Sequence, residues 1–134
     1  MSTTKKVELV TVDLDPKPGA LASVFAAFRE AKVEVDGCWA YQMGPDKGVA
    51  HIYARDVARA KDALTKLGKK PRSDFACYAT GTDRLGVYHE HLKKISDAGL
   101  NLEASDAFAV DDKFAIMFWV DQKDVPKLCS ALGC

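Results

Sequence analysis

DPKPGAL, residues 15–21, is the stretch that turns the beginning of this chain from an extended segment into a helix. Residues 7–14 before it are rich in β-branched side chains, which favour a strand. After it, apolar side chains recur at spacings of three and four from residue 20 to residue 31, as in a helix with one buried face. Proline and glycine end the strand. The sequence therefore predicts a strand, a turn and a helix.

A hairpin and a second helix are predicted to follow. Residues 33–43 alternate between apolar and polar side chains, which predicts a strand. GPDKG at residues 44–48 is a turn sequence, so residues 49–54 are predicted to form the second strand of a hairpin. Asp56 is a good N-cap, and the apolar stripe that begins after it closes at Gly68. The predicted order is strand, helix, strand, strand, helix.

The same order recurs in the second half of the chain. Residues 75–80 predict a strand, DRLGVY at residues 83–88 predicts a turn into a helix, and residues 100–110 and 114–120 predict a hairpin. Asp124 begins the last helix, with Pro126 in its first turn, and Gly133 ends it. Turn, cap and core positions of the two halves correspond, which indicates a duplicated unit. We place the first unit at residues 1–70 and the second at residues 71–134.

The last predicted strand carries apolar side chains on both faces. Phe114, Ile116 and Phe118 would face one way, and Met117 and Trp119 the other. A strand of this kind is buried on both sides, so the two sheets pack together or the molecule dimerises. The second unit also lacks a fourth strand of its own. Its sheet is therefore short, or a neighbour supplies the edge.

Composition narrows the class of protein. The 134 residues are 48% apolar and 28% charged, with a formal net charge of zero, values normal for a soluble globular protein. The sequence contains no basic stripe interleaved with aromatic residues, the pattern that would indicate a nucleic-acid partner. No apolar run is long enough for a membrane span, and the first residues do not resemble a signal peptide. We therefore expect a cytoplasmic protein with neither nucleic acid nor membrane as a partner.

The cysteines match no metal or redox motif. They form no Cys-x-x-Cys pair, and their spacings fit no zinc pattern. We interpret Cys38, Cys77 and Cys129 as small core or half-buried residues. Cys134 is expected to be exposed, and we assign it no function. The sequence predicts no metal site and no cofactor.

No catalytic motif is present. The sequence contains no Gly-x-Ser-x-Gly, P-loop or Rossmann fingerprint. His89 and His91 point to nearly opposite sides of a helix, so they cannot chelate together, and we expect both on its solvated surface. His51 is expected to be a half-buried strand residue. Aromatic residues such as Tyr41 and Tyr88 are more often core than pocket. We do not expect an enzyme.

The whole pattern resembles the ACT domain family. The residues that carry the likeness are KPGAL after the first strand, AGLNL at residues 98–102, and the Asp-Val pairs that begin the last helix of each half. The resemblance covers about residues 6–133, and the arrangement is similar to small stand-alone bacterial proteins of two tandem ACT domains. It implies an α+β fold of two ferredoxin-like βαββαβ units packed together, with antiparallel sheets and helices on one face. It also implies amino-acid ligands bound where the units meet.

Both strand-to-helix turns are candidate ligand sites. Glycine lets a ligand approach the backbone, the N–H groups that follow it favour a carboxylate, and a nearby aspartate can accept an ammonium group. The second turn has the spacing that the family uses, Asp-x-x-Gly. The resemblance also adds Asn101, because an asparagine often begins the next strand in the family. The candidates in the second turn are therefore Asp83, Leu85, Gly86, Val87, Tyr88 and Asn101. The candidates in the first turn are Asp15, Pro18, Gly19, Ala20 and Leu21. If one turn binds a ligand, we favour the second. The alternative is that glycine only permits each turn and aspartate caps each helix.

The function implied by the resemblance is a regulatory or sensor module that binds a free amino acid or a similar small metabolite. Its output would be a change in association, as a homodimer or with an enzyme partner. The alternative is a ligand-free interaction or scaffold module that docks a partner protein through its sheet face.

Overall fold

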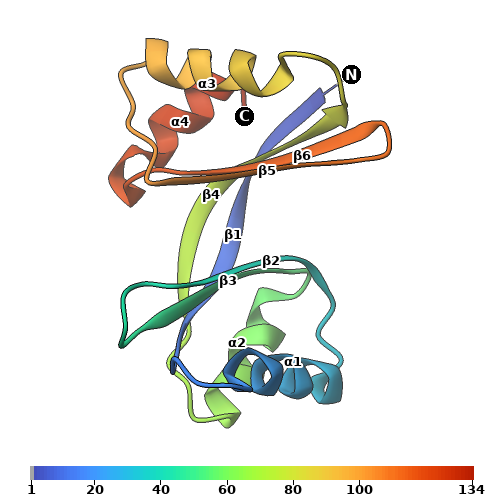
Figure 1. Cartoon of the computed structure of the whole chain (residues 1–134), viewed down its shortest axis with the longest axis vertical. Helices are drawn as coiled ribbons and strands as arrows, with labels where there is room; N and C mark the ends of the chain where they lie inside the picture. Colours follow the sequence, from blue (N-terminus) through green and yellow to red (C-terminus); the bar gives the residue numbers. More distant parts are fainter. Residues whose placement is uncertain (1) are drawn as a thin grey trace. The chain divides into compact units, whose positions relative to one another are not determined.

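A computed structural model describes residues 2–134 of the chain (Figure 1). The elements in chain order are β1 (Ser2–Leu14), α1 (Ala20–Ala31), β2 (Val35–Gln42), β3 (Gly48–Ala54), α2 (Val57–Lys66), β4 (Arg72–Thr82), α3 (Val87–Asp97), β5 (Ala104–Val110), β6 (Lys113–Trp119), the 3₁₀ turn η1 (Gln122–Asp124) and α4 (Val125–Leu132). The fold is α+β and the strand pairs are antiparallel, as predicted. Among the described residues, no helix is long and apolar enough to cross a membrane.

The chain forms two compact units. The first unit is Glu8–Asp74, and the second consists of the residues up to Val7 together with Phe75–Cys134. β1 and β4 therefore each begin in one unit and end in the other. The division predicted after residue 70 lies near the crossing in β4. The crossing in β1 was not predicted.

The first unit is a sheet covered by two helices. β3 pairs with β1, where Val10 lies opposite Ile52, and with β2, where Trp39 lies opposite His51. α1 and α2 lie on the same side of these strands (Figure 1). The apolar side of the sheet and the inner faces of both helices form one core, whose members include Val10, Val12, Val24, Phe28, Ile52 and Leu64.

The start of β4 completes this unit. The Ser73 hydroxyl donates a hydrogen bond of 2.6 Å to the Glu8 carboxylate, and the Arg72 guanidinium lies 3.2 Å from an oxygen of Asp13. These polar contacts lie along β1. They hold the first residues of β4 beside the first unit's own strands.

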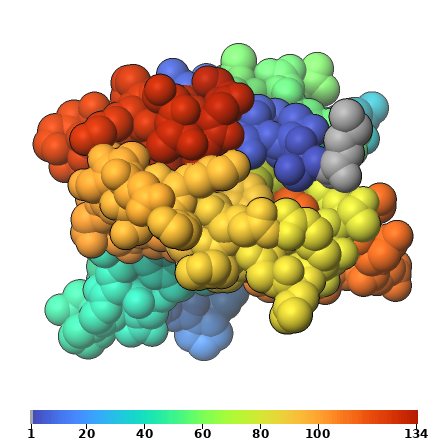
Figure 2. All heavy atoms as spheres, turned by 90° about the horizontal axis from the view of Figure 1, so that it is seen from above, coloured from blue at the N-terminus to red at the C-terminus, as the bar shows by residue number. Residues whose placement is uncertain are grey.

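The second unit repeats the arrangement with its own core. β6 pairs with β4, where Cys77 lies opposite Phe118, and with β5, where Phe108 lies opposite Ala115. α3 and α4 lie side by side on the unit's surface (Figure 2). Both faces of β6 are buried as predicted, since the relative exposure of Ile116 and of Met117 is 1%.

The second unit obtains its fourth strand from the start of the chain. The residues of β1 up to Val7 belong to this unit, and β1 neighbours β4 in the strand order β1-β4-β6-β5. The Lys6 ammonium lies 4.8 Å from the centre of the Phe75 ring. The strand was predicted to begin only at residue 7, because the polar residues before it carry no alternating pattern.

β5 begins later than predicted. Gly99 has a φ of 73°, and the Leu100 N–H donates to the Ile95 carbonyl at 3.2 Å, so these residues terminate α3. Strand pairing starts with the Glu103 N–H, which donates to the Trp119 carbonyl at 2.8 Å. Asn101, which was expected at the start of this strand, therefore lies in the connecting segment and is exposed.

Candidate functional site

The first turn places an uncapped helix start at the surface. Gly19 has a φ of 87° and is the N-cap of α1, and no side chain hydrogen-bonds to the first N–H groups of this helix. The Lys17 N–H donates to the Asp15 carbonyl at 2.8 Å, which closes the turn. The Asp15 carboxylate lies 3.9 Å from the Lys17 ammonium. Asp15 does not cap the helix, so this part of the alternative interpretation is wrong.

The second turn has the same backbone. Gly86 has a φ of 84° and is the N-cap of α3, again without a side-chain cap. The Asp83 N–H donates to the Asp112 carbonyl at 2.7 Å, which fastens the turn to the loop between β5 and β6. Asp83 does not cap its helix either, and the Leu85 side chain is fully exposed.

An ion pair distinguishes the second turn. The Arg84 guanidinium makes a two-pronged contact with the Glu90 carboxylate, with one nitrogen-to-oxygen distance of 2.8 Å. The hydrogen bonds from Arg84 lower the pKa of Glu90 below its ordinary value. Glu90 lies in the first turn of α3, whereas the first turn of α1 contains no acidic residue. The positive end of α3 thus already has a carboxylate beside it, and that of α1 does not.

A pocket lies beside the first turn. Its volume is about 410 Å³, close to those of two other hollows of the first unit, which are about 420 Å³ and about 430 Å³. The pocket of about 410 Å³ is the one at the turn, and it is lined by Leu14, Asp15, Pro16, Lys17, Pro18, Ala20, Leu21, Ala40, Tyr41, Gln42 and Gly48.

 

The uncapped start of α1 distinguishes this pocket from the hollow between the two helices of the first unit. A hollow between α1 and α2 is lined by Ala27, Glu30, Ala31, Ala63, Lys66 and Leu67, and it contains no residue of either turn. The pocket at the first turn combines the start of α1, the aspartate of the turn and the end of the β2–β3 hairpin. It can receive an anionic group at the helix start and a cationic group at Asp15.

Tyr41 is one of the residues that line the pocket, and its side chain contacts His51. The Tyr41 hydroxyl lies 3.1 Å from Nε2 of His51, and Nδ1 of the same ring lies 2.9 Å from the hydroxyl of the fully buried Thr11. Asp74 lies 3.7 Å from Nδ1. His51 is half-buried, as predicted. The imidazole therefore links the buried Thr11 hydroxyl to the Tyr41 phenol, on the face of the sheet opposite α1 and α2.

The hairpin residues of the pocket were missed by the sequence analysis. Tyr41 was interpreted as a core or sheet residue, but it is 47% exposed. Tyr41 pairs with Val49 and Gln42 with Gly48, so the hairpin register brings them beside Leu14 at the end of β1. A Cβ on Gly48 would lie 3.3 Å from the Leu14 carbonyl oxygen. In the sequence, the only sign of this close approach was that a glycine, Gly48, stands at the turn.

The second-turn candidates are not gathered in the same way. Val87 is buried in the core of the second unit, and the Tyr88 hydroxyl donates to Oγ of Ser105 at 2.7 Å. Ser105 in turn donates to the Met117 carbonyl at 3.0 Å. These contacts turn Val87 and Tyr88 toward the sheet, while Asn101 is exposed beyond the other end of α3.

His91 is not on the solvated surface, contrary to expectation. It lies one turn after Val87 and one turn before Ile95, and all three side chains are buried. Nδ1 donates to the Val87 carbonyl at 2.8 Å, and the ring stacks on Phe118 with centroids 5.9 Å apart. The spacing of four from two apolar residues was the available signal. His89 is exposed, as predicted.

Three cysteines that are distant in sequence come together in the second unit. Cys77 and Cys129 are buried, as predicted, and the exposed Cys134 places its sulfur 2.8 Å from that of Cys129. Burial, the contact with Cys129 and the neighbouring sulfurs raise the pKa of Cys77 far above its ordinary value. Burial and the contact with Cys129 raise the pKa of Cys134 to about 11. The thiols of Cys77 and Cys134 are therefore protonated at neutral pH.

The comparisons with known proteins concern the fold. No protein-family model matches the sequence, and no curated protein matches it. Protein BT0572 from Bacteroides thetaiotaomicron has a similar structure, with a TM-score of 0.84 and 16% sequence identity over 97% of this chain and 88% of that chain. The ligand-free regulatory subunit of aspartate kinase from Thermus thermophilus has a TM-score of 0.68 and 13% identity, over 98% of this chain and 94% of that one. The corresponding subunit from Thermus flavus has a TM-score of 0.64 and 15% identity, over the same shares. The fold is ACT-like.

Proposed function

We propose that the protein is a regulatory module that binds a free amino acid or a similar small metabolite in the pocket at the first turn. The observation that carries the proposal is the pocket itself, which lies between an uncapped helix start, Asp15 and Tyr41. The fold adds support, because two solved structures with this fold are named as regulatory subunits. The proposal moves the favoured site from the second turn to the first.

Each part of an amino acid has a partner of suitable chemistry in this pocket. The carboxylate faces the first N–H groups of α1, where the helix dipole is positive and no acidic residue competes. The ammonium group replaces the Lys17 ammonium, which now lies 3.9 Å from the Asp15 carboxylate. Leu21 and Pro18 offer apolar surface to the side chain.

The proposed output is a change in association, either of the protein with itself or with an enzyme partner. Exposed apolar residues on β5 support such an interface, because Phe108 is 61% exposed and Val110 is 70% exposed. β5 is the last strand of the order β1-β4-β6-β5, so its outer edge is open to pairing within the described residues. A homodimer, a ligand at the junction of the units and the absence of catalysis remain predictions.

The same strand favours the second candidate function, a ligand-free module that docks a partner protein. In this second function, the partner protein binds to the exposed side of β5 and the pocket binds no ligand. It is a weaker proposal, because it leaves the uncapped start of α1 and the turn aspartate without a role.

A thermal-shift screen with the twenty amino acids tests the proposed function. A ligand that binds only the folded protein stabilises it by about 2.7 kcal/mol at a concentration of 100 times Kd, so a specific ligand raises the midpoint clearly. We expect a shift for one amino acid or a chemically related group of them, and none for the corresponding amino-acid amides, which lack the carboxylate. No shift at millimolar concentration for any of the twenty would contradict the proposal and favour the docking module.

A further inference from the structure

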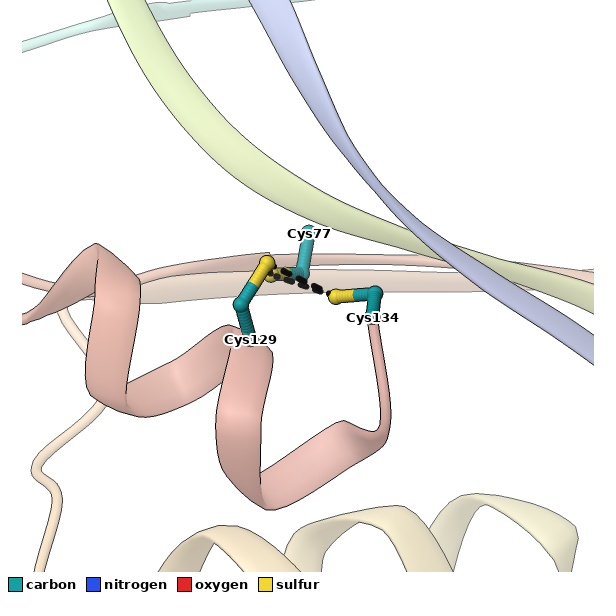
Figure 3. Close-up of side chains that lie close together, drawn as sticks. All are labelled: Cys77, Cys129 and Cys134. Atoms are coloured by element: carbon teal, nitrogen blue, oxygen red, sulfur yellow. Dashed lines mark hydrogen bonds between the residues drawn. The ribbon is translucent and has the colours of Figure 1, made fainter.

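Three sulfur atoms converge on one point in the second unit (Figure 3). Sγ of Cys77 lies 3.6 Å from that of Cys129 and 3.7 Å from that of Cys134. The sulfurs of Cys129 and Cys134 are 2.8 Å apart. Among the described residues, these three cysteines are a cluster of donors close enough to share one metal ion. All of its donor atoms are sulfur.

The fold builds this cluster from two elements. Cys77 lies within β4, opposite Phe118 of β6, and Cys129 lies on the buried face of α4. Gly133 ends α4 with a φ of 83°, a conformation that turns the chain back over the helix. The Cys134 N–H then donates to the Cys129 carbonyl at 2.9 Å. The glycine turn thus brings the third sulfur over the other two.

We propose that Cys77, Cys129 and Cys134 form a binding site for a soft, thiophilic metal cation. Metal–sulfur bonds of about 2.3 Å hold the sulfurs of a thiolate site roughly 3.8–4.0 Å apart. Two of the three separations are already close to this range, and the third reaches it by a shift of the exposed Cys134. Sulfur donors select zinc, copper(I) and similar cations over magnesium or calcium, which require oxygen.

Binding converts three thiols into thiolates. Each metal–sulfur bond forms as the S–H bond breaks and its proton passes to the solvent, so one cation replaces up to three protons without any change in oxidation state. Cys77 is fully buried and its surroundings are apolar, with Phe118 and Leu128 in the same core. The exposed side at Cys134 leaves room for a solvent molecule as a fourth ligand.

Convergence of three sulfurs argues for a metal rather than a disulfide. A disulfide would join two of the cysteines and leave the third as a thiol beside it. It would not explain why the third sulfur lies so close to the other two. The site is also independent of the proposed function, because all of its residues lie in the second unit and the pocket lies in the first. Failure of one proposal leaves the other intact.

Cadmium titration of the reduced full-length chain under anaerobic conditions tests the site. Cd²⁺ prefers thiolates and gives an ultraviolet sulfur-to-metal charge-transfer band, which reports the bonds directly. We expect one Cd²⁺ per chain, displaceable by Zn²⁺, and an affinity weakened by roughly tenfold or more in Cys134→Ser. Cys77→Ala and Cys129→Ala, which remove buried donors, should lose the charge-transfer band.

Cys38→Ala is the matched control, because Cys38 lies in the first unit outside the cluster. It should bind Cd²⁺ as the parent protein does. Circular dichroism confirms that each variant is folded, and Cys134→Ser decides the question because it alters an exposed residue. Cd²⁺ binding that survives Cys134→Ser unchanged, or that is lost in Cys38→Ala, overturns the proposal. So does a reduced protein that takes up no Cd²⁺ and links Cys129 to Cys134 on mild oxidation.

Discussion

The turn before α1 and the turn before α3 have the same backbone and different surroundings. Gly19 and Gly86 both have a positive φ, and neither helix has a side-chain cap. The first turn lies beside a pocket with Tyr41 on its wall. The second carries the Arg84–Glu90 ion pair and turns its next two side chains into the core.

This difference shows that a turn motif does not make a site by itself. Glycine in the left-handed region produces the turn and leaves N–H groups at the helix start in both places. What lies opposite those groups then decides whether a ligand has a place there. At α1 it is a hairpin end, and at α3 the protein's own Glu90 carboxylate lies in the first helical turn.

The largest expected effect comes from a charge at the third position of each helix. Ala22 in α1 and His89 in α3 are equivalent and exposed. Aspartate at either position suits the helix dipole and preserves folding, but it repels a bound carboxylate. Ala22→Asp should therefore abolish the thermal shift produced by the amino-acid ligand, and His89→Asp should leave it unchanged. The reverse result would move the site to the second turn, and an unchanged response in both variants would exclude both turns.

An intermediate effect is expected from removing the glycines. An added Cβ at Gly19 or Gly86 meets no atom within 4 Å, so the loss comes only from the left-handed backbone. Gly19→Ala and Gly86→Ala should each lower the free energy of unfolding by about 1–2 kcal/mol, as urea denaturation would measure. Similar losses confirm that the two backbones are equivalent. A much larger loss at one turn would mean that its surroundings are tighter than its twin's.

The smallest effect is expected from the ion pair of the second turn. The pKa of Glu90 is lowered in the folded protein, so the stabilisation is fully present above the ordinary carboxyl pKa and is lost as the pH falls through the lowered value. Arg84→Gln should reduce the melting temperature slightly near neutral pH and have no effect in acid, because both groups are exposed. Glu90→Gln should reproduce this profile. A loss that persists in acid would point to a packing role for Arg84.

Local signals predicted the helices well. The bounds of α1 agree with the apolar spacing, and the Asp56 carboxylate accepts the Arg59 N–H at 3.0 Å, as an N-cap should. Gly133 ends α4 as predicted. Asp124 begins that helix without a side-chain hydrogen bond to it, and Asp121 caps η1 instead. Such signals work because a helix satisfies its hydrogen bonds with near neighbours in sequence.

Strand ends and site membership needed contacts that are remote in sequence. The polar start of β1 becomes a strand because another strand lies beside it, and β5 starts late because the end of α3 uses the residues before it. Tyr41 reaches the first turn only through the register of β2 with β3 and of β3 with β1. No spacing along the chain contains that information.

By itself, the sequence determined the order of the elements, the two glycine turns and the apolar faces of helices and strands, because these depend on neighbours within a few residues. Only the tertiary structure decided which turn has a pocket, that His91 is buried and that Cys77, Cys129 and Cys134 meet. Side chains far apart in sequence come together only when strand pairing and helix packing place their elements side by side. A function that depends on such contacts is therefore identified from the tertiary structure, whereas the turn motifs that contribute to it can be identified from the sequence.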